Sequence, residues 1–291
     1  MSLNFIFFYY MHYYIIMFSQ YIANDLQQYY DTIQNSKLKE IVLYSIEGGK
    51  CIRGFIVKHI VETLSGKQCD WQPIASIELI HGISLILDDL PCMDNDVMRR
   101  GKQSTFARFG ERHAILISMY GISKAFQLIF NGLKNINNNY NMESIQLIIN
   151  KWSEFIGQNL VVGQLMDFRD NIGELLNVNI QSNTVELIYY KTSSLFVFAF
   201  ILGAIYCGYN KLDDFQNMGL HFGMMYQIMD DSNDTEHDNI NNNIVLSHGK
   251  VKCKEMYTTA QCKFVELLLQ YNILTPMFEK LINELNSNVN L

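Results

Sequence analysis

The sequence contains few prolines, no basic stripe and no closely paired cysteines. Only three prolines occur in 291 residues, and no spaced runs of β-branched residues lie between turn signals, which favours helices over strands. The six cysteines include no CxxC pair, so we expect reduced thiols in a cytoplasmic protein rather than disulfides or a zinc site. A net charge of -7 also argues against nucleic acid as a partner, because phosphate neutralisation needs clustered Lys and Arg.

The length of the chain suits one large helical domain with a sizeable core. We expect an all-α fold in which residues 18–291 form a single domain. Residues 1–17 form a separate aromatic-rich extension, which is shorter than the roughly 20 apolar residues of a spanning helix and lacks a small-residue cleavage site. We therefore expect no stable membrane span and favour a true start at Met11 or Met17, with an aromatic interface or dimer segment as the alternative.

Apolar residues that recur at three and four positions predict helices along most of the chain. The helix over 74–87 is apolar nearly all round, which predicts that it is buried. The other predicted helices cover residues 18–33, 38–44, 55–64, 112–134, 143–168, 186–206, 215–229, 251–270 and 275–286. Asn-rich stretches between them are predicted loops.

Two acidic clusters each follow an apolar run. The first holds four aspartates and then three cations between Asp88 and Lys102. The second begins at Asp230, where Gln227, Asp230 and Asp234 share one helix face. Burying such charges is costly unless a divalent cation and an anion lie between them. The pattern therefore predicts two carboxylate walls that share magnesium ions and a diphosphate.

The first cluster begins at the end of the helix over 74–87. His81 lies on the same helix face as Asp88. Because Pro91 prevents regular helical hydrogen bonding, the chain should bulge there and return Asp94 to the side of Asp88, where hard oxygen ligands suit Mg²⁺. A solvated acidic loop that caps the helix is the ordinary alternative.

Cations at two further places suggest anion binding. Lys50 and Arg53 follow a Gly-Gly pair at the predicted start of a helix, beside free backbone N–H groups that suit an oxyanion. A Gly-Gly turn with two solvated cations is the alternative reading. Lys191 is the only cation in the apolar run over 186–206, so it needs a partner or an anionic ligand.

Five motifs follow one another along the chain: GGKxxR at 48–53, ELIHxxSLIxDDLPCMDNDxxRRGK at 78–102, GQxxD at 163–167, KT at 191–192 and QxxDDxxD at 227–234. Their combination closely resembles that of the trans-type isoprenyl diphosphate synthases, also called polyprenyl synthetases. The resemblance runs from about Phe18 to near the C-terminus. It implies an all-α, single-domain fold around a deep central cavity, usually as a homodimer.

The resemblance also implies a role for each motif. The expected ligands of Mg²⁺, for three ions per active site with substrate bound, are Asp88, Asp89, Asp94, Asp230, Asp231 and Asp234. The residues that resemble contacts to the allylic diphosphate are Arg99, Lys191, Thr192 and Gln227. Those that resemble the isopentenyl diphosphate site are Lys50, Arg53, His81 and Arg100. The expected catalytic residues are Asp88, Asp89, Lys191 and Asp230.

The implied reaction joins isopentenyl diphosphate to an allylic diphosphate. Breaking the allylic C–O bond yields a carbocation and a diphosphate leaving group, which metals and cations must stabilise more than the bound ester. In the family that this chain resembles, a large aromatic residue five positions before the first aspartate is expected to form the floor of the product pocket and to limit the product to farnesyl diphosphate. Because Ile83 stands there with Ser84 beside it, we expect geranylgeranyl diphosphate rather than farnesyl diphosphate.

Two other functions stay open, one because of a departure from the family pattern and one because it shares the metal-carboxylate chemistry. Asn241 to Asn243 occupy the region where a lysine that helps close the site is expected, and Lys250 or Lys252 are its candidate substitutes. The first alternative is therefore a catalytically weak, regulatory subunit of another synthase. The second is a class I terpene cyclase, which is disfavoured because the cations at Lys50, Arg53 and Arg100 imply a second diphosphate.

Overall fold

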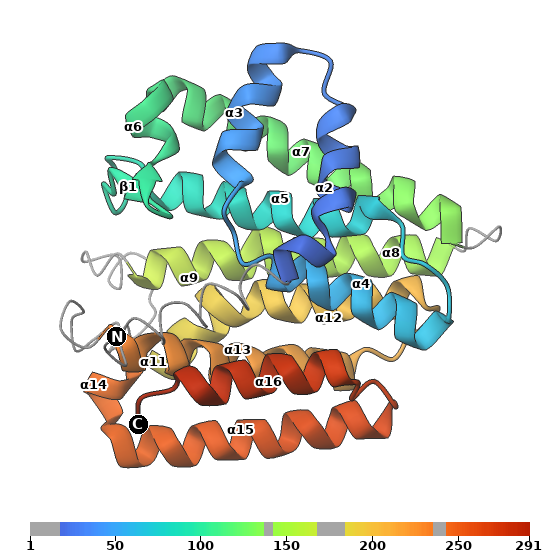
Figure 1. Ribbon diagram of the computed structural model, residues 1–291, viewed down its shortest axis with the longest axis vertical. Helices are drawn as coiled ribbons and strands as arrows, with labels where there is room; N and C mark the ends of the chain where they lie inside the picture. Colours follow the sequence, from blue (N-terminus) through green and yellow to red (C-terminus); the bar gives the residue numbers. More distant parts are fainter. Residues whose placement is uncertain (1–17, 137–141, 168–183, 235–242) are drawn as a thin grey trace, which may run out of the picture. The chain divides into compact units, whose positions relative to one another are not determined.

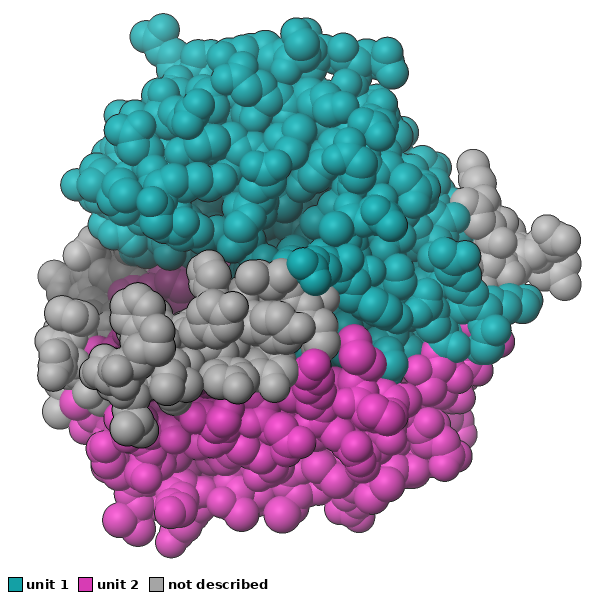
Figure 2. Space-filling model, viewed as in Figure 1, with its two compact units in different colours: residues 1–62, 66–141 teal, residues 63–65, 142–291 magenta. Residues whose placement is uncertain are grey.

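The computed structural model describes residues 18–136, 142–167, 184–234 and 243–291. The chain divides into two compact units, unit 1 of residues 1–62 and 66–141 and unit 2 of residues 63–65 and 142–291 (Figure 2). The proposed extension over residues 1–17 lies outside the described residues. Helices dominate both units, which confirms the predicted all-α class.

Unit 1 is built around α5 (Trp71–Asp88), the helix that carries the first aspartate pair. Helix α5 is capped by the Asp70 carboxylate, which accepts a hydrogen bond of 3.2 Å from the backbone N–H of Gln72. Helix α7 (Glu111–Ile136) packs beside α5 (Figure 1). The remaining helices of unit 1 are α2 (Ala23–Asp31), α3 (Ser36–Ile46), α4 (Ile52–Ser65) and α6 (Thr105–Phe109). The buried helix predicted over 74–87 is therefore confirmed, three residues longer at its start and one at its end.

A short β-hairpin follows the first acidic cluster. Strands β1 (Met98–Arg99) and β2 (Lys102–Gln103) pair antiparallel. Arg100 and Gly101 join them with φ values of 54° and 74°, and two positive values are typical of a type I′ turn. The sequence does not predict this hairpin, because two-residue strands carry no alternation of polar and apolar residues.

Unit 2 is built around α12 (Ser194–Tyr206), in which every residue is buried. It packs against α13 (Asp213–Asn233), which in turn contacts α15 (Lys250–Gln270) and α16 (Pro276–Asn288) (Figure 1). The shorter helices of this unit are α8 (Met142–Trp152), α9 (Leu160–Asp167), α11 (Thr184–Leu187) and α14 (Ile244–His248). The second aspartate pair lies near the C-terminal end of α13.

Two π-helical segments interrupt helices that the sequence predicted as continuous. Segment η1 (Ser153–Asn159) separates α8 from α9, and η2 (Ile188–Ser193) separates α11 from α12. Such segments widen the helical turn and often occur at functional sites. Lys191 and Thr192, two predicted substrate contacts, both lie in η2.

Among the described residues, two helical stretches are long and apolar enough to cross a membrane by length and composition, Glu111–Leu133 and Thr184–Tyr206. The second is 78% buried inside the structure, which is the environment of a core helix and accounts for its hydropathy. The first is only 39% buried. Helix α7 therefore presents an apolar face to its surroundings.

Candidate active site

The predicted site residues fall into two groups, one in each unit. Unit 1 contains the first acidic cluster, the cations of the hairpin and the cations at the start of α4. Unit 2 contains η2 and the aspartates of α13. We describe each group within its own unit.

The chain bulges after α5 as the sequence predicted. Helix α5 ends at Asp88, and the backbone N–H of Asp94 donates to the Asp88 carbonyl at 2.9 Å. Between them, the N–H groups of Met93 and Asn95 both donate to the carbonyl of Leu90, at 2.8 and 3.1 Å. The bulge therefore brings the backbone of Asp94 back to that of Asp88. Asp88 is half-buried and Asp94 is exposed.

Asp89 is buried and forms an ion pair with Arg99. Its Oδ1 atom accepts hydrogen bonds from Arg99 Nε at 2.8 Å and Nη2 at 2.5 Å, and Arg99 Nη2 also donates to Asp96 at 3.0 Å. Burial raises the pKa of Asp89, and the hydrogen bonds and charge of Arg99 offset part of that effect. The second aspartate of the pair thus holds the predicted diphosphate-binding arginine in place.

Arg100 lies in the hairpin turn and points to a different partner. Its Nη1 donates to the backbone carbonyl of Ile46 at 2.6 Å and to that of Glu47 at 3.3 Å. A Cβ on Gly49 would lie 3.0 Å from Arg100 Nη2, which is too close for an ordinary contact. The Gly-Gly pair therefore makes room for the guanidinium beside the start of α4.

The cations at the start of α4 adjoin a buried carboxylate. Arg53 Nη1 lies 3.2 Å from His81 Nε2, while His81 Nδ1 lies 3.9 Å from a carboxylate oxygen of Glu78. Because arginine only donates, His81 Nε2 must accept and the ring proton must lie on Nδ1. Burial, followed by the charge of Arg53, lowers the pKa of His81 to about 4, so the ring is neutral at pH 7.

Glu78 is the fixed point of this cluster. Its Oε1 accepts a hydrogen bond of 2.6 Å from the backbone N–H of Gly54 in α4. Burial alone would raise the pKa of Glu78, but hydrogen bonds from His81 and Gly54 and the charge of Arg53 lower it below its usual value. The carboxylate therefore stays ionised and balances the cations, and Lys50 is half-buried just before the helix.

The two predicted chain-length residues have different surroundings. Ile83 is 2% exposed, and a Cβ on Gly121 of α7 would collide with its Cδ1. Ser84 is half-buried, and its hydroxyl donates to the His81 carbonyl at 2.9 Å. Ile83 thus fills the contact between α5 and α7, whereas Ser84 faces a less crowded side of α5.

In unit 2, Lys191 forms an ion pair with Asp167. A Cβ on Gly163 would lie 2.5 Å from the backbone nitrogen of Lys191, so the missing side chain lets α9 approach η2 closely enough for this pair. Gln164, the other polar residue of the motif, has a buried amide nitrogen that finds no hydrogen-bond partner in the described part of the chain. Lys191, for which the sequence predicted a partner or an anionic ligand, therefore has the carboxylate of Asp167 as its partner.

Thr192, Gln227 and Asp231 form a hydrogen-bond chain. The Thr192 hydroxyl donates to Gln227 Oε1 at 2.6 Å, and Gln227 Nε2 donates to Asp231 Oδ1 at 2.6 Å. Asp231 is 3% exposed, whereas Asp230 is half-buried and Asp234 is exposed. The second aspartate of this pair, like Asp89, is the buried one.

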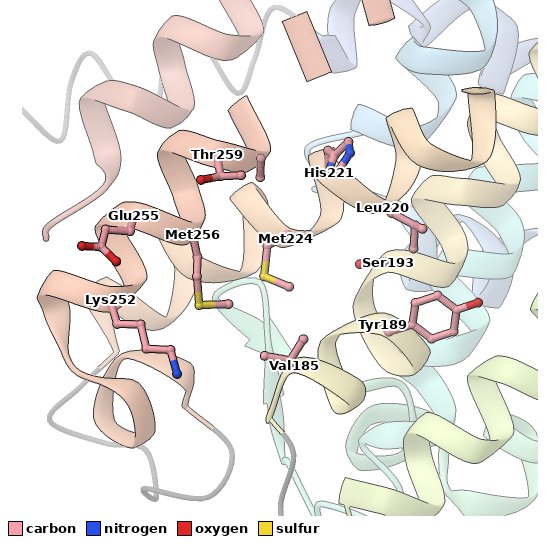
Figure 3. A pocket seen from close by; sticks show the side chains of 11 residues that line it. Val185, Tyr189, Ser193, Leu220, His221, Met224, Lys252, Glu255, Met256 and Thr259 are labelled. Carbon is pink, nitrogen blue, oxygen red and sulfur yellow. The ribbon is translucent and has the colours of Figure 1, made fainter. Parts of the chain in front are cut away.

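A groove of unit 2 lies away from these residues. It encloses about 500 Å³ among η2, α11, α13 and α15, with Met224 and Met256 in its walls and Lys252 at its edge (Figure 3). None of the predicted site residues lines it. Lys250 instead donates to the backbone carbonyl of Asn290 at 3.1 Å. The other candidate for the absent lysine, Lys252, lines the groove.

Three residues with site contacts received no role from the sequence. Glu78 faces His81, Asp167 pairs with Lys191, and Asn243 contacts the backbone of Asp231. The first two lie inside recognisable motifs, so their charge beside a predicted ligand was an available signal. Asn243 lies in a polar stretch whose composition predicted only a loop, and Asn241 and Asn242 are outside the described residues.

Carboxylate clusters with adjoining cations on an all-α fold are typical of proteins that bind diphosphates together with a divalent metal. Comparison with known sequences supports the same class. Residues 35–246 match the family model described as polyprenyl synthetase. A farnesyl diphosphate synthase of Micrococcus luteus is 36% identical over 207 residues, which cover 69% of this chain and 67% of the relative. A chloroplastic geranylgeranyl pyrophosphate synthase of Catharanthus roseus is 32% identical, over 67% of this chain and 54% of the relative.

The chain therefore belongs to the polyprenyl synthetase family and is a trans-prenyltransferase of the farnesyl or geranylgeranyl diphosphate synthase type. Solved structures agree on the fold. A geranyltransferase from Legionella pneumophila matches with a TM-score of 0.77 at 22% identity, over 97% of this chain and 98% of that one. A geranyltranstransferase from Thermotoga maritima matches with a TM-score of 0.75 at 24% identity, over 94% and 99%.

Proposed function

We propose that this chain condenses isopentenyl diphosphate with an allylic diphosphate, head to tail, to give a short-chain prenyl diphosphate. The observation that carries the proposal is that cationic side chains lie at two separate places within unit 1. One is Arg99 beside the first aspartates, and the other is Lys50, Arg53 and Arg100 beside the start of α4. Two separate anion sites suit two diphosphate substrates, whereas a cyclase needs only one.

The donor set of the two acidic clusters fits Mg²⁺. No three Asp, Glu, His or Cys side chains within the described ranges could hold a metal by themselves. Mg²⁺ usually keeps several waters and binds one or two carboxylates together with substrate phosphates. Sufficient protein donors are therefore the half-buried or exposed aspartates of the two clusters, Asp88, Asp94, Asp230 and Asp234. We propose three Mg²⁺ ions per active site when substrate is bound.

The chain's own residues then act on the leaving diphosphate and the new cation. Bound Mg²⁺ would neutralise the charge that develops on the diphosphate as the allylic C–O bond breaks. Arg99, Lys191 and Thr192 would hold that diphosphate with hydrogen bonds that strengthen as its charge grows. Lys50, Arg53 and Arg100 would hold isopentenyl diphosphate, whose double bond attacks the allylic carbon. The proton lost afterwards passes to the departing diphosphate, so no strong protein base is needed.

For the product, we favour geranylgeranyl diphosphate over farnesyl diphosphate. Support comes from Ile83, whose aliphatic side chain packs against Gly121, while Ser84 beside it is small and half-buried. Purified protein incubated with Mg²⁺, isopentenyl diphosphate and farnesyl diphosphate should yield geranylgeranyl diphosphate by chromatography. The absence of that product would contradict the proposed length.

A substitution sharpens the length test. Ile83→Tyr should shorten the main product, because the ring cannot fit over α7 and must turn toward the neighbouring space. Leu79→Tyr is the matched control, since Leu79 overlies the same glycine one turn earlier on α5. An unchanged product with Ile83→Tyr would remove Ile83 as the floor, and equal shortening by both variants would point to general overpacking.

We also propose that the enzyme works as a homodimer through α7. Its exposed apolar residues, between 42% and 63% accessible, lie on one face: Ile115, Leu116, Met119 and Ile122. A contiguous apolar face of this kind marks a protein interface. Light scattering after size exclusion should give a dimer that Leu116→Glu dissociates. Val251→Glu, an equally drastic change at an exposed position of α15, should leave the dimer intact.

A regulatory role remains the second candidate. It is favoured by the lysine missing before α14, and one relative is the large subunit 1 of a heterodimeric geranylgeranyl pyrophosphate synthase from Arabidopsis thaliana. Robust turnover by the purified chain alone would exclude this role.

We propose a cytoplasmic location, supported by the free cysteines of the described residues, which are usual in a reducing compartment. Fractionation of the host cell would test this location.

A further inference from the structure

Asp231 lies at the centre of a hydrogen-bond chain that joins three elements of unit 2. Its Oδ1 accepts from Gln227 Nε2 at 2.6 Å within α13. Its Oδ2 accepts from the backbone N–H of Ile244, the first residue of α14, at 2.7 Å. Through Gln227 the chain continues to the Thr192 hydroxyl in η2. Both carboxylate oxygens are thus engaged by donors of the protein.

Asn243 strengthens the link between α13 and α14. Its side chain is fully buried, and its Nδ2 donates to the backbone carbonyl of Asp231 at 2.8 Å. Its Oδ1 accepts from the N–H groups of Val245 and Leu246, at 2.9 and 3.1 Å, which caps the N-terminus of α14. Side chain and backbone of Asp231 therefore both hold the start of α14.

The charge of Asp231 sets the direction of the whole chain. A carboxylate only accepts hydrogen bonds, so Gln227 must turn its amide NH₂ group toward Asp231 and its carbonyl toward Thr192. Thr192 then has to donate its single hydroxyl proton to Gln227. Asp231 thereby fixes the orientation of Gln227 and Thr192, the two side chains that the family resemblance assigns to the allylic diphosphate.

We propose that Asp231 is a positioning residue, which orients Gln227 and Thr192 and anchors α14, and is not a ligand of Mg²⁺. The inference rests on the proposed function for its catalytic consequence, but its structural part does not. The metal donors of the second cluster are then Asp230 and Asp234, which are less buried. Asn243 and Asp231 hold the start of α14, in the region where the family pattern has a lysine.

The structural part is tested without any turnover. In full-length Asp231→Ala, hydrogen exchange of the backbone amides of 243–248, followed by mass spectrometry, should become at least about tenfold faster, because one net hydrogen bond is lost. Asn243→Ala should accelerate the same peptide with Asp231 intact. Amides of α12 are the internal control. Unchanged exchange of 243–248 in Asp231→Ala would overturn the anchoring role.

Asp231→Asn separates positioning from metal binding. Asparagine can accept from Ile244 N–H and donate to the Gln227 carbonyl, if Gln227 turns over and donates to Thr192. It should therefore recover most of the exchange protection that Asp231→Ala loses. Recovered protection supports the anchoring role, whereas the response to Mg²⁺ tests metal binding, because the amide of asparagine lacks the negative charge of a carboxylate ligand.

Two further readouts complete the test. Asp231→Ala should raise the KM for the allylic diphosphate about 10- to 100-fold. Asp231→Asn should recover only part of that loss, because it restores the place of Gln227 but reverses its amide. The Mg²⁺ concentration for half-maximal rate should stay within about threefold in both variants. Asp230→Asn should shift that concentration clearly. If the wild type has no turnover, the proposed function fails. The rise in thermal midpoint of each variant with MgCl₂ and inorganic pyrophosphate still shows whether Asp231 binds Mg²⁺. Loss of that stabilisation in Asp231→Asn, with exchange intact, would make Asp231 a ligand.

Discussion

The two aspartate pairs share a sequence pattern but are held by different chemistry. In each pair the second aspartate is the buried one, Asp89 at 2% and Asp231 at 3% exposure. Asp89 accepts from the guanidinium of Arg99, whereas Asp231 accepts from a neutral amide and a backbone N–H. The same Asp-Asp pair therefore forms an ion pair with an arginine in unit 1 and a network of neutral hydrogen-bond donors in unit 2.

This difference determines what each buried carboxylate controls. Charge-assisted hydrogen bonds are stronger than neutral ones, but removing one partner leaves an uncompensated charge. Asp89 therefore controls a cation that is itself a predicted substrate contact. Asp231 instead controls the direction in which neutral groups donate. Substitutions that remove charge but keep shape should affect the two pairs unequally.

The largest effect is expected where the two pairs are alike. Asp88 and Asp230 are the first aspartates, both half-buried, and both are proposed donors to Mg²⁺. Asp88→Asn and Asp230→Asn should each lower kcat by about 10²- to 10³-fold, with the thermal midpoint nearly unchanged. Steady-state rates across a magnesium titration measure this effect. Wild-type turnover in either variant would break the parallel between the clusters.

The next effect should separate them. Asp89→Asn removes the charge that holds Arg99 but keeps the shape of the side chain. It should lower affinity for the allylic diphosphate about 10-fold and destabilise the fold by about 1–2 kcal/mol, a value reduced because Arg99 is a third exposed and screened by water. Urea denaturation and KM measure the two parts. Equal losses for Asp89→Asn and Asp231→Asn would remove the distinction between ion pair and dipole network.

The sequence predicted the parts of this comparison that depend on local chemistry. Pro91 predicted the bulge that returns Asp94 to Asp88, and the Gly-Gly pair predicted a tight turn before Arg53. It did not predict that Arg100 would occupy the space above Gly49, because that contact depends on a hairpin of two-residue strands. Local periodicity cannot anticipate partners that approach from distant segments.

The second cluster was harder to predict for the same reason. The bond between Asp231 and the backbone of Ile244 crosses 13 positions, most of them in a polar stretch with no helical pattern. The π-helical turn at Lys191 was also missed, since an apolar run predicts a helix but not the number of residues in each turn. The ligand-like residues were visible in the sequence, whereas their buried supports were not.

A smaller effect concerns the pH dependence of unit 1. His81 has a folded-state pKa of about 4, below its usual 6.5, so the unfolded chain binds more protons between these values. The contribution of His81 to the free energy of unfolding should be fully present above about pH 6.5. It should be lost as the pH decreases toward 4, by at most about 3 kcal/mol. Urea denaturation at pH 7 and pH 5 measures the loss, and His81→Asn should flatten the profile. A wild-type profile as flat as that of the variant would place His81 outside the acid response.

The smallest effect is expected at the exposed end of the same arginine. Arg99 also bonds Asp96 at 3.0 Å, but the Asp96 side chain is 53% exposed, and water competes for such pairs. Asp96→Asn should change stability by less than about 0.5 kcal/mol and leave KM close to the wild-type value. Asp89→Asn and Asp96→Asn each remove one carboxylate charge beside the same guanidinium. Their ratio therefore compares a buried partner that accepts two hydrogen bonds with an exposed partner that accepts one. If both variants cost the same, the buried position of the second aspartate would not explain how Arg99 is held.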